Sequence, residues 1–386
     1  MTPEPTATQL KTEQDCIDFV RGCTFLATGG GGSPERGVEL LLGQLAAGQP
    51  AGWVDRHAIP NDVYTVSVFG MGGRPPVGHP TTDELAAVGL REPRGINTMV
   101  EAVRALADYA GVQIGAIVPI ELGGSNTSAP MVAAASLGMV VPDGDYTGRA
   151  IPEITQIVPS IAGVPGAPFA TVDRWGDVCI LTRVTGDAMG ERIGKLLSQA
   201  AFGGVSMAGF LMPATRMRDV LVPGTLSRCL EIGRVVRQAR EQHGDPVTTL
   251  AEFVGGAVLF RGVVEANELD DSEGYRYGIG THRIGGIGAG HGRTCSIWYK
   301  NENHVCWVDG QPFVTSPDLI CIVDATTGEP KINSAVAAGQ HVAVLGVPAT
   351  GVYRSQTGIE RLGPRHFGFD IDYIPMAVGG GKPLAR

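Results

Sequence analysis

Signals of several common protein classes are missing from this chain of 386 residues. It has no run of basic residues and no basic stripe interleaved with aromatics, and its net charge is −9, so nucleic acid is not an expected partner. No apolar stretch is long enough to span a bilayer, and residues 1–12 are polar and lack the apolar core of a signal peptide. We therefore expect a cytoplasmic protein without a membrane partner.

Local motifs for metals and nucleophiles are missing too. The seven cysteines are scattered and show no CxxC spacing, which favours buried thiols in a reducing compartment over disulfides or a structural zinc site. The eight histidines form no HxH or HExxH pair. No glycine cluster continues into the Lys-Ser/Thr of a P-loop, and no GxSxG nucleophile elbow occurs. Spacing alone therefore argues for neither a zinc site nor a serine nucleophile.

Glycine is what the sequence has in excess. The 56 glycines do not follow a collagen period but cluster in an otherwise apolar chain, at residues 29–32, 70–73, 123–124 and 379–381. This pattern favours tight functional loops over a flexible linker. With 43% hydrophobic and 18% charged residues, the chain is long enough for two packed domains, which we place at residues 1–166 and 167–386.

The first domain alternates helix-like and strand-like segments. Helix signals lie at 12–21, 33–47 and 97–109, strand-like runs lie at 63–69 and 114–120, and a short apolar stretch precedes the first glycine cluster. This order predicts an α/β domain with a mainly parallel sheet. Because polar loops follow the strands, we expect them to meet at the sheet edge where such folds bind ligands. The loops are 28–36, 70–76, 121–127 and 142–153.

The second domain is expected to be mostly β. Residues 169–172 and 178–184 flank a hairpin turn, and short strands separated by turns follow from residue 257 onward. Helix patterns remain near 187–201 and 226–242. The sequence therefore predicts a C-terminal β-rich domain with a few helices, built as a barrel or a sandwich.

An acidic segment follows the apolar run at 137–141. It holds Asp143, Asp145 and Glu153 together with Arg149. Carboxylates close to a core must be paired or must hold a ligand. They could bind a divalent ion or serve as a general base, and the alternative is an internal salt bridge to Arg149. We favour a functional role.

The glycine loops supply candidate substrate contacts. The backbone of Gly30, Gly31 and Gly32 precedes a helix start and could hold an anion or a ring carbonyl, or could simply turn the chain from a strand into a helix. Glu121 could accept a ring N–H or bind a metal, and Asn126 could donate to a carbonyl. The alternative is that both tie neighbouring loops together.

Two further polar residues are candidates for the same site. Arg365 could pair with a substrate carboxylate, or with Asp370 or Asp372 nearby in the sequence. His79 follows the second glycine loop and could reach the site, or could stabilise that loop.

Taken together, these segments resemble the S-methyl thiohydantoin desulfurase family over nearly the whole chain. The resemblance rests on the order and spacing of residues 26–32, 121–126, 143–153, 224–227, 301–303, 317–328 and 363–368. It implies an N-terminal α/β domain, a C-terminal β-rich domain, a metal such as zinc, and hydrolysis at the C2 carbon of a five-membered ring. Water would replace a methylthio group and release methanethiol and a hydantoin. The loop at 72–83 departs from the family pattern and would reshape the pocket.

The hypothesis that follows is a metal-dependent hydrolase of a small heterocycle. The expected catalytic carboxylates are Asp145, Glu153 and Glu121. The expected substrate contacts are Gly30, Gly31, Gly32, Asn126, Arg149 and Arg365. The expected ligands of zinc or another divalent ion are Asp143, Asp145 and His79. Because carboxylates alone suit Mg²⁺ or Mn²⁺ better, zinc would need a nitrogen or sulfur ligand, from His79, Cys23 or His304.

Two alternatives stay open. The substrate could be a hydantoin or another cyclic amide, or the protein could be a non-catalytic, ligand-binding subunit of a hydantoinase-like complex. A homo-oligomer or a hydantoinase-type partner is compatible with each of these functions.

Overall fold

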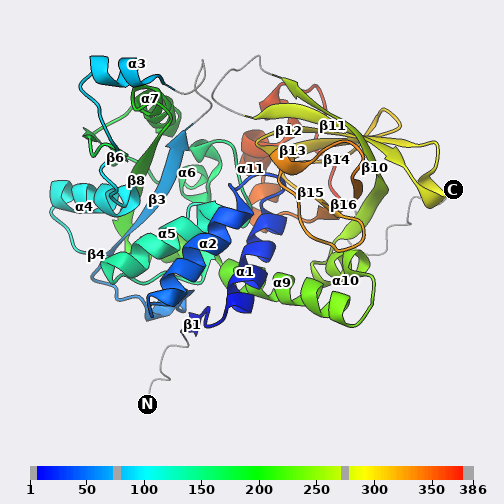
Figure 1. Ribbon diagram of the computed structural model, residues 1–386, viewed down its shortest axis with the longest axis horizontal. Helices are drawn as coiled ribbons and strands as arrows, with labels where there is room; N and C mark the ends of the chain where they lie inside the picture. Colours follow the sequence, from blue (N-terminus) through cyan, green and yellow to red (C-terminus); the bar gives the residue numbers. More distant parts are fainter. Residues whose placement is uncertain (1–6, 73–79, 271–277, 377–386) are drawn as a thin grey trace.

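The computed structural model describes residues 7–72, 80–270 and 278–376. Figure 1 shows a helix-covered sheet from the first half of the chain beside an antiparallel half-barrel from the second half. The helices are α1 (Glu13–Leu26), α2 (Pro34–Ala46), α3 (Thr82–Ala87), α4 (Thr98–Ala110), α5 (Gly124–Leu137), α6 (Val158–Ile161), α7 (Asp187–Ala200), α8 (Ala214–Val220), α9 (Thr225–Glu241), α10 (Pro246–Phe253) and α11 (Gln356–Leu362).

The strands form two main sheets and two short pairs. The first sheet contains β3 (Tyr64–Gly72), β4 (Ile114–Ile117), β6 (Phe169–Asp173), β7 (Val178–Leu181) and β8 (Gly204–Pro213). The second contains β10 (Ala257–Asp270), β11 (Ile279–Gly286), β12 (Thr294–Lys300), β13 (Glu302–Val308), β14 (Gln311–Thr315), β15 (Leu319–Asp324) and β16 (His341–Val347). The short pairs are β1 (Thr8–Gln9) with β2 (Gly52–Trp53), and β5 (Gly144–Asp145) with β9 (Val222–Pro223).

The first glycine cluster joins two helices. The starts of α1 and α2 were predicted correctly, because the hydroxyls of Thr12 and Ser33 cap them. The expectation of a strand before the cluster is wrong, since α1 continues through Leu26. Phe19, Cys23 and Leu26 are all buried, and their spacing of four and three residues places them on one helical face. That periodicity, rather than the apolar stretch alone, decides the local structure.

The first sheet has the strand order β4-β3-β8-β6-β7. Only β3 and β4 run parallel, so the prediction of a mainly parallel sheet is confirmed for that pair alone. The other neighbouring strands are antiparallel, because β6 and β7 form the predicted hairpin and β8 runs back between β3 and β6. These three strands come after residue 166, so the chain continues to build this sheet beyond the expected domain boundary.

Close helix packing supports the base of the molecule. A Cβ on Gly22 of α1 would lie 1.8 Å from the carbonyl oxygen of Cys229, and one on Gly233 of α9 would lie 1.8 Å from that of Asp18. The two glycines therefore let the backbones of α1 and α9 touch, as Figure 1 shows in the lower part of the molecule.

The second sheet is antiparallel throughout, in the order β14-β13-β12-β11-β10-β16-β15. It confirms the predicted β-rich C-terminal region, and α7 and α9 confirm the predicted helices. Side chains of β15 alternate between its two faces: Cys321 and Val323 join the core beneath the helices, and Ile320 and Ile322 join a second core on the other face. The first core thus spans both halves of the chain.

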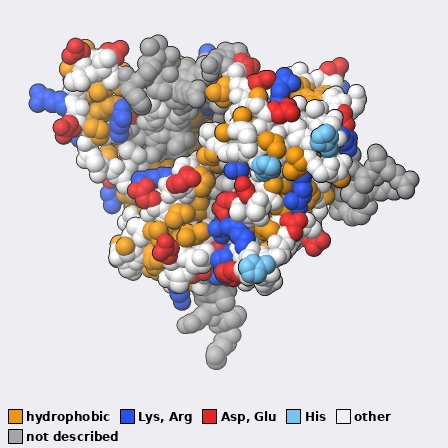
Figure 2. Space-filling model, turned by 45° about the vertical axis from the view of Figure 1, so that its right-hand side comes forward, with side chains coloured by type: hydrophobic (Ala, Val, Ile, Leu, Met, Phe, Trp, Pro, Cys, Tyr) orange, Lys and Arg blue, Asp and Glu red, His pale blue; other side chains and the backbone are white. Residues whose placement is uncertain are grey.

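The surface carries charges of both signs. Acidic and basic side chains are interspersed on the face shown in Figure 2, and pairs such as Arg283–Glu268 and Arg293–Asp309 lie on the second sheet. Within the described ranges, no helix combines the length and the apolar character that crossing a bilayer requires.

Candidate active site

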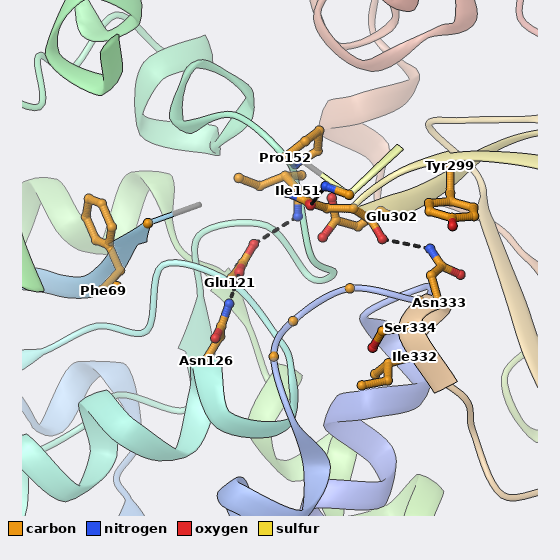
Figure 3. Close-up of a pocket in the computed structure, with 18 of the residues that line it drawn as sticks. Phe69, Glu121, Asn126, Ile151, Pro152, Tyr299, Glu302, Ile332, Asn333 and Ser334 are labelled. Carbon is orange, nitrogen blue, oxygen red and sulfur yellow. Dashed lines mark hydrogen bonds between the residues drawn. The ribbon is translucent and has the colours of Figure 1, made fainter. Parts of the chain in front are cut away.

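A cavity of about 600 Å³ lies where the glycine-rich loops face the second sheet (Figure 3). The four loops predicted to converge all contribute to its wall, through residues 29–33 and 70–72, through Glu121 and Asn126, and through Ile151 and Pro152. The opposite wall includes Tyr299, Glu302 and Asn333. This volume lies in the range of small-molecule sites.

Glu121 follows β4 and is held at one side of the cavity (Figure 3). Its Oε1 accepts a hydrogen bond from Nδ2 of Asn126 at 2.7 Å, and its Oε2 accepts one from the backbone N–H of Ile151 at 2.9 Å. Burial raises the pKa of the Glu121 carboxyl to about 7, although these two hydrogen bonds lower it. Near neutral pH, Glu121 can therefore both lose and accept a proton.

Glu302 begins β13 and is a second buried carboxyl in the cavity wall, only 2% exposed. Its Oε2 is buried and has no hydrogen-bond partner among the described residues. Burial and the charge of Glu121 raise the pKa of Glu302 well above its usual value. The cavity wall therefore holds two buried carboxyls, and the pKa of each is raised above the ordinary value of a glutamate.

The first glycine cluster makes room for Glu302. A Cβ on Gly30 would lie 1.8 Å from Oε1 of Glu302, so only glycine allows this carboxyl to approach. Gly29 and Gly31, with φ of +98° and +76°, adopt a conformation that other residues rarely reach. The first glycine cluster thus allows the side chain of Glu302, from the second half of the sequence, to pack directly against its backbone.

Asn333 fixes the same cluster from the C-terminal side. Its backbone N–H donates to the carbonyl of Gly29 at 2.8 Å, and its Nδ2 donates to the carbonyl of Asn301 at 2.7 Å. Its Oδ1 lies 3.0 Å from Nε2 of His282. Burial lowers the pKa of His282 to about 4, so the ring is neutral, and Nε2 must be the donor. Asn333 therefore ties Gly29 to the turn that carries Glu302.

A buried ion pair on α7 forms a further part of the wall. Nζ of Lys195 lies 3.5 Å from Oε1 of Glu191, and both side chains are about 10% exposed or less. Oε2 of Glu191 accepts from the backbone N–H of Ile154 at 2.9 Å. The pair presents opposite charges at one place and so adds little net charge to the cavity.

Ile151 and Pro152 at the end of the acidic segment line the cavity, but its charged residues do not. Asp145 is fully buried, and its carboxylate accepts hydrogen bonds from Thr147, Gly148 and the hydroxyl of Thr225. Asp143 accepts from the backbone and the hydroxyl of Ser227 at 3.0 and 2.7 Å. The two carboxylates therefore hold the start of α9 in place. Thr225, the first residue of that helix, follows Asp145 by 80 residues in the sequence.

Asp145→Asn should lower the free energy of unfolding by about 1–3 kcal/mol, because an amide NH₂ group would face N–H and O–H donors that now find an acceptor. Chemical denaturation measures this loss, with Asp219→Asn on the exposed side of α8 as the matched control. An unchanged denaturation midpoint for Asp145→Asn would contradict the anchoring role.

Glu153 joins the two halves of the chain outside the cavity. Its Oε1 accepts from Nζ of Lys300 at 3.1 Å, and its Oε2 lies 3.0 Å from Nε2 of His366. Burial raises the pKa of Glu153, but the hydrogen bond and charge of His366 and the charge of Lys300 outweigh it and bring the pKa down to about 2. Glu153 is therefore an ionised bridge near neutral pH.

Arg149 and Arg365 also lie away from the cavity wall. Arg149 is buried and donates to the carbonyls of Ala150 and Pro317 at 2.9 and 2.5 Å. Arg365 pairs with Asp370 and Asp372 at 2.8 and 3.0 Å, which is the alternative that its sequence context offered. His79 lies outside the described residues.

Those residues expected to bind zinc that the structure describes make other contacts. Asp143 and Asp145 use their oxygens in the hydrogen bonds around α9, Cys23 is buried within α1, and His304 is buried with its ring 3.9 Å from that of Phe367. In the part of the chain that the structure describes, no group of three or more His, Cys, Asp or Glu is arranged to hold a metal. The described lining of the cavity offers oxygen donors and no histidine or cysteine, whereas zinc sites in proteins are dominated by nitrogen and sulfur.

Glu302, Lys195 and Asn333 are cavity residues that sequence analysis did not identify. Glu302 lies between two asparagines, a pattern typical of a turn, and Asn301 does adopt the left-handed conformation with φ of 58°. The signal that could have pointed to Glu302 is a carboxylate at the start of a strand that continues into an apolar run at 305–308, since a charge close to a core must be paired or must hold a ligand.

Comparison with known proteins gives a family and a fold. The family model described as "S-Me-THD-like, N-terminal domain" matches residues 14–183, and that described as "S-Me-THD-like, C-terminal domain" matches residues 185–376. A crystal structure of a protein from Chromobacterium violaceum is similar, with a TM-score of 0.75 and 21% identity, over 96% of this chain and 100% of that one. No curated protein matches the chain.

Proposed function

Because the chain belongs to the S-Me-THD-like family through both of its domains, we propose that it is a hydrolase of S-methylated thiohydantoin rings. The reaction replaces the methylthio group on ring carbon C2 by oxygen and gives a hydantoin and methanethiol. We assign it to the cavity that contains Glu121 and Glu302.

The observation that carries this proposal is the pair of buried carboxyls, Glu121 and Glu302, in the wall of one cavity. Glu302, whose pKa burial raises well above the usual value, is suited to give a proton. Glu121, with a pKa of about 7, is suited to accept one from water. Two buried carboxyls in one site are a common basis for acid and base roles.

The proton transfers balance without a further reactant. Glu302 donates its proton to the C2-bonded ring nitrogen, which makes C2 more electrophilic, while Glu121 takes a proton from the water that attacks C2. When the C–S bond breaks, the new hydroxyl on C2 returns its proton to Glu302 and becomes the carbonyl. Glu121 gives its proton to the departing sulfur, so methanethiol leaves and both carboxyls regain their initial states.

Neighbouring groups would orient the ring. Asn126 holds Glu121 in place, and the backbone of residues 30–32 lines the same end of the cavity and can contact the ring oxygen. Ile151 supplies the second hydrogen bond to Glu121. Fixing both carboxylate oxygens of the base limits the rotamers that it can adopt and so favours one direction of attack.

Incubation of the purified protein with an S-methyl thiohydantoin should release methanethiol and hydantoin in equal amounts. A thiol-reactive dye measures the first product and NMR spectroscopy measures the second. If hydantoins bind, as calorimetry would show, and yet no S-methylated ring is turned over, the proposal fails and a ligand-binding subunit becomes the better description.

A further inference from the structure

The cavity is larger than the reacting ring alone needs. An S-methyl thiohydantoin ring has about eight non-hydrogen atoms, whereas a cavity of 600 Å³ is of the size that drug-sized ligands fill. The two carboxyls and the glycine cluster occupy one region of the wall, so much of the remaining volume is available to a substituent on the ring.

One part of that remaining wall is apolar. Phe69 and Met71 lie at the end of β3 and are 7% and 5% exposed, and Met99 in the first turn of α4 is half-buried beside them in the lining. Figure 3 places the ring of Phe69 on the side of Glu121 that faces away from Glu302. Ile120 lines the cavity between β4 and Glu121. A substituent that leaves the ring in this direction meets aliphatic, thioether and aromatic groups.

The charged side chains on α7 next to this apolar part balance each other. Lys195 and Glu191 form a buried pair and already interact with each other, so a charged substituent would have to compete with an existing partner and lose its hydration. An uncharged apolar group loses nothing and gains about 25 cal/mol for each Å² of apolar surface removed from water.

We propose that the substrates are thiohydantoins with a bulky, uncharged apolar substituent at C5, such as an aryl-methyl or branched alkyl group, and that Met99 limits the size of that substituent. This inference rests on the proposed function, since it assumes that the ring lies between Glu121 and Glu302. It adds the chemical class of the side chain, which the family does not specify.

The test compares S-methyl thiohydantoins that carry hydrogen, isobutyl, benzyl, carboxymethyl or aminobutyl at C5. We expect kcat/KM for the benzyl compound to exceed that for the unsubstituted ring by about 100-fold, with the two charged compounds at or below the unsubstituted ring. Equal values throughout the series, or a preference for a charged substituent, would overturn the inference.

Met99→Trp narrows the apolar region and gives a second readout. It should lower kcat/KM for the benzyl compound by about 10-fold or more, and by a clearly smaller factor for the unsubstituted ring. The matched control is Met189→Trp, in the first turn of α7 and 44% exposed, outside the cavity lining. An equal loss for both substrates in Met99→Trp would contradict the role of Met99.

Binding of the corresponding hydantoins, measured by calorimetry, separates this inference from the proposed reaction. One outcome is that no compound is turned over but the affinity for hydantoins increases with the size of an apolar C5 substituent. The hydrolase proposal then fails, and the inference that the cavity binds an apolar substituent is supported. If methanethiol is released without regard to the substituent, the hydrolase proposal stands and the inference fails.

Discussion

Glu302→Gln should reduce kcat for methanethiol release by about 10²- to 10⁴-fold, the usual contribution of a positioned general acid. The amide is close in size to the carboxyl and so fits the space that Gly30 leaves beside Oε1. It cannot give up a proton to the ring nitrogen. The loss should therefore appear in kcat rather than in KM, and stopped-flow detection of the thiol under single-turnover conditions measures the chemical step directly.

Glu153→Gln is the matched control for this prediction. The same chemical change is made at a carboxyl that binds Lys300 and His366 instead of lining the cavity. It should lower stability, since an ionised bridge is lost, and keep kcat within a few-fold of the wild type. If Glu153→Gln lost as much activity as Glu302→Gln, the assignment of Glu302 as the general acid would be contradicted, and Glu153 would again be a candidate.

The stability of Glu302→Gln gives an independent check. Because the pKa of Glu302 is raised in the folded protein, its protonated form is favoured there, and the stability that this contributes is present at low pH and is lost as the pH rises. Glutamine does not titrate. The melting temperature of the variant relative to the wild type should therefore increase as the pH is raised from 5 to about 9. A difference that stays constant over this range would contradict a raised pKa.

The sequence predicted which loops line the cavity better than which carboxyls do. Four loops were expected at one place because glycine clusters and polar residues follow apolar segments, and residues from all four do line the cavity. The same reasoning found Glu121 and Asn126, which lie in one of those loops. It assumed a mainly parallel sheet, and yet only β3 and β4 are parallel. The loops still meet although the sheet is mainly antiparallel, because they contact one another directly, as Gly31 and Gly123 do.

Contacts between distant segments explain what could not be predicted. Asp145 is a candidate base when seen within its own loop, but Thr225 and Gly148 already use its oxygens. Glu302 has the local context of a turn, and its burial depends on Gly30, far away in the sequence. In both cases the partner, rather than the residue itself, decides between a structural and a chemical role.

Activity of the wild-type protein should rise with pH through about 7, because Glu121 must be ionised to accept a proton from water. Below that pH the carboxyl is protonated and kcat/KM falls tenfold for each pH unit. Glu121→Gln should remove this limb together with about 10²- to 10⁴-fold of the activity. Measuring kcat/KM from pH 5 to about 9 tests the assignment, and a limb near the ordinary glutamate pKa of about 4.3 would contradict it.

Asn126→Leu provides the sharper form of the same test. The donor at 2.7 Å from Oε1 stabilises the ionised carboxylate and lowers its pKa, so an apolar side chain of similar size should raise the pKa of Glu121 and move the acidic limb to higher pH. Ser136→Ala, also on α5 but hydrogen-bonded only within that helix, is the control and should leave the limb in place. If Asn126 served only to bind substrate, Asn126→Leu would raise KM without moving the limb. A shifted limb therefore identifies Asn126 as the residue that positions and tunes the base, and Glu121 as the group that titrates.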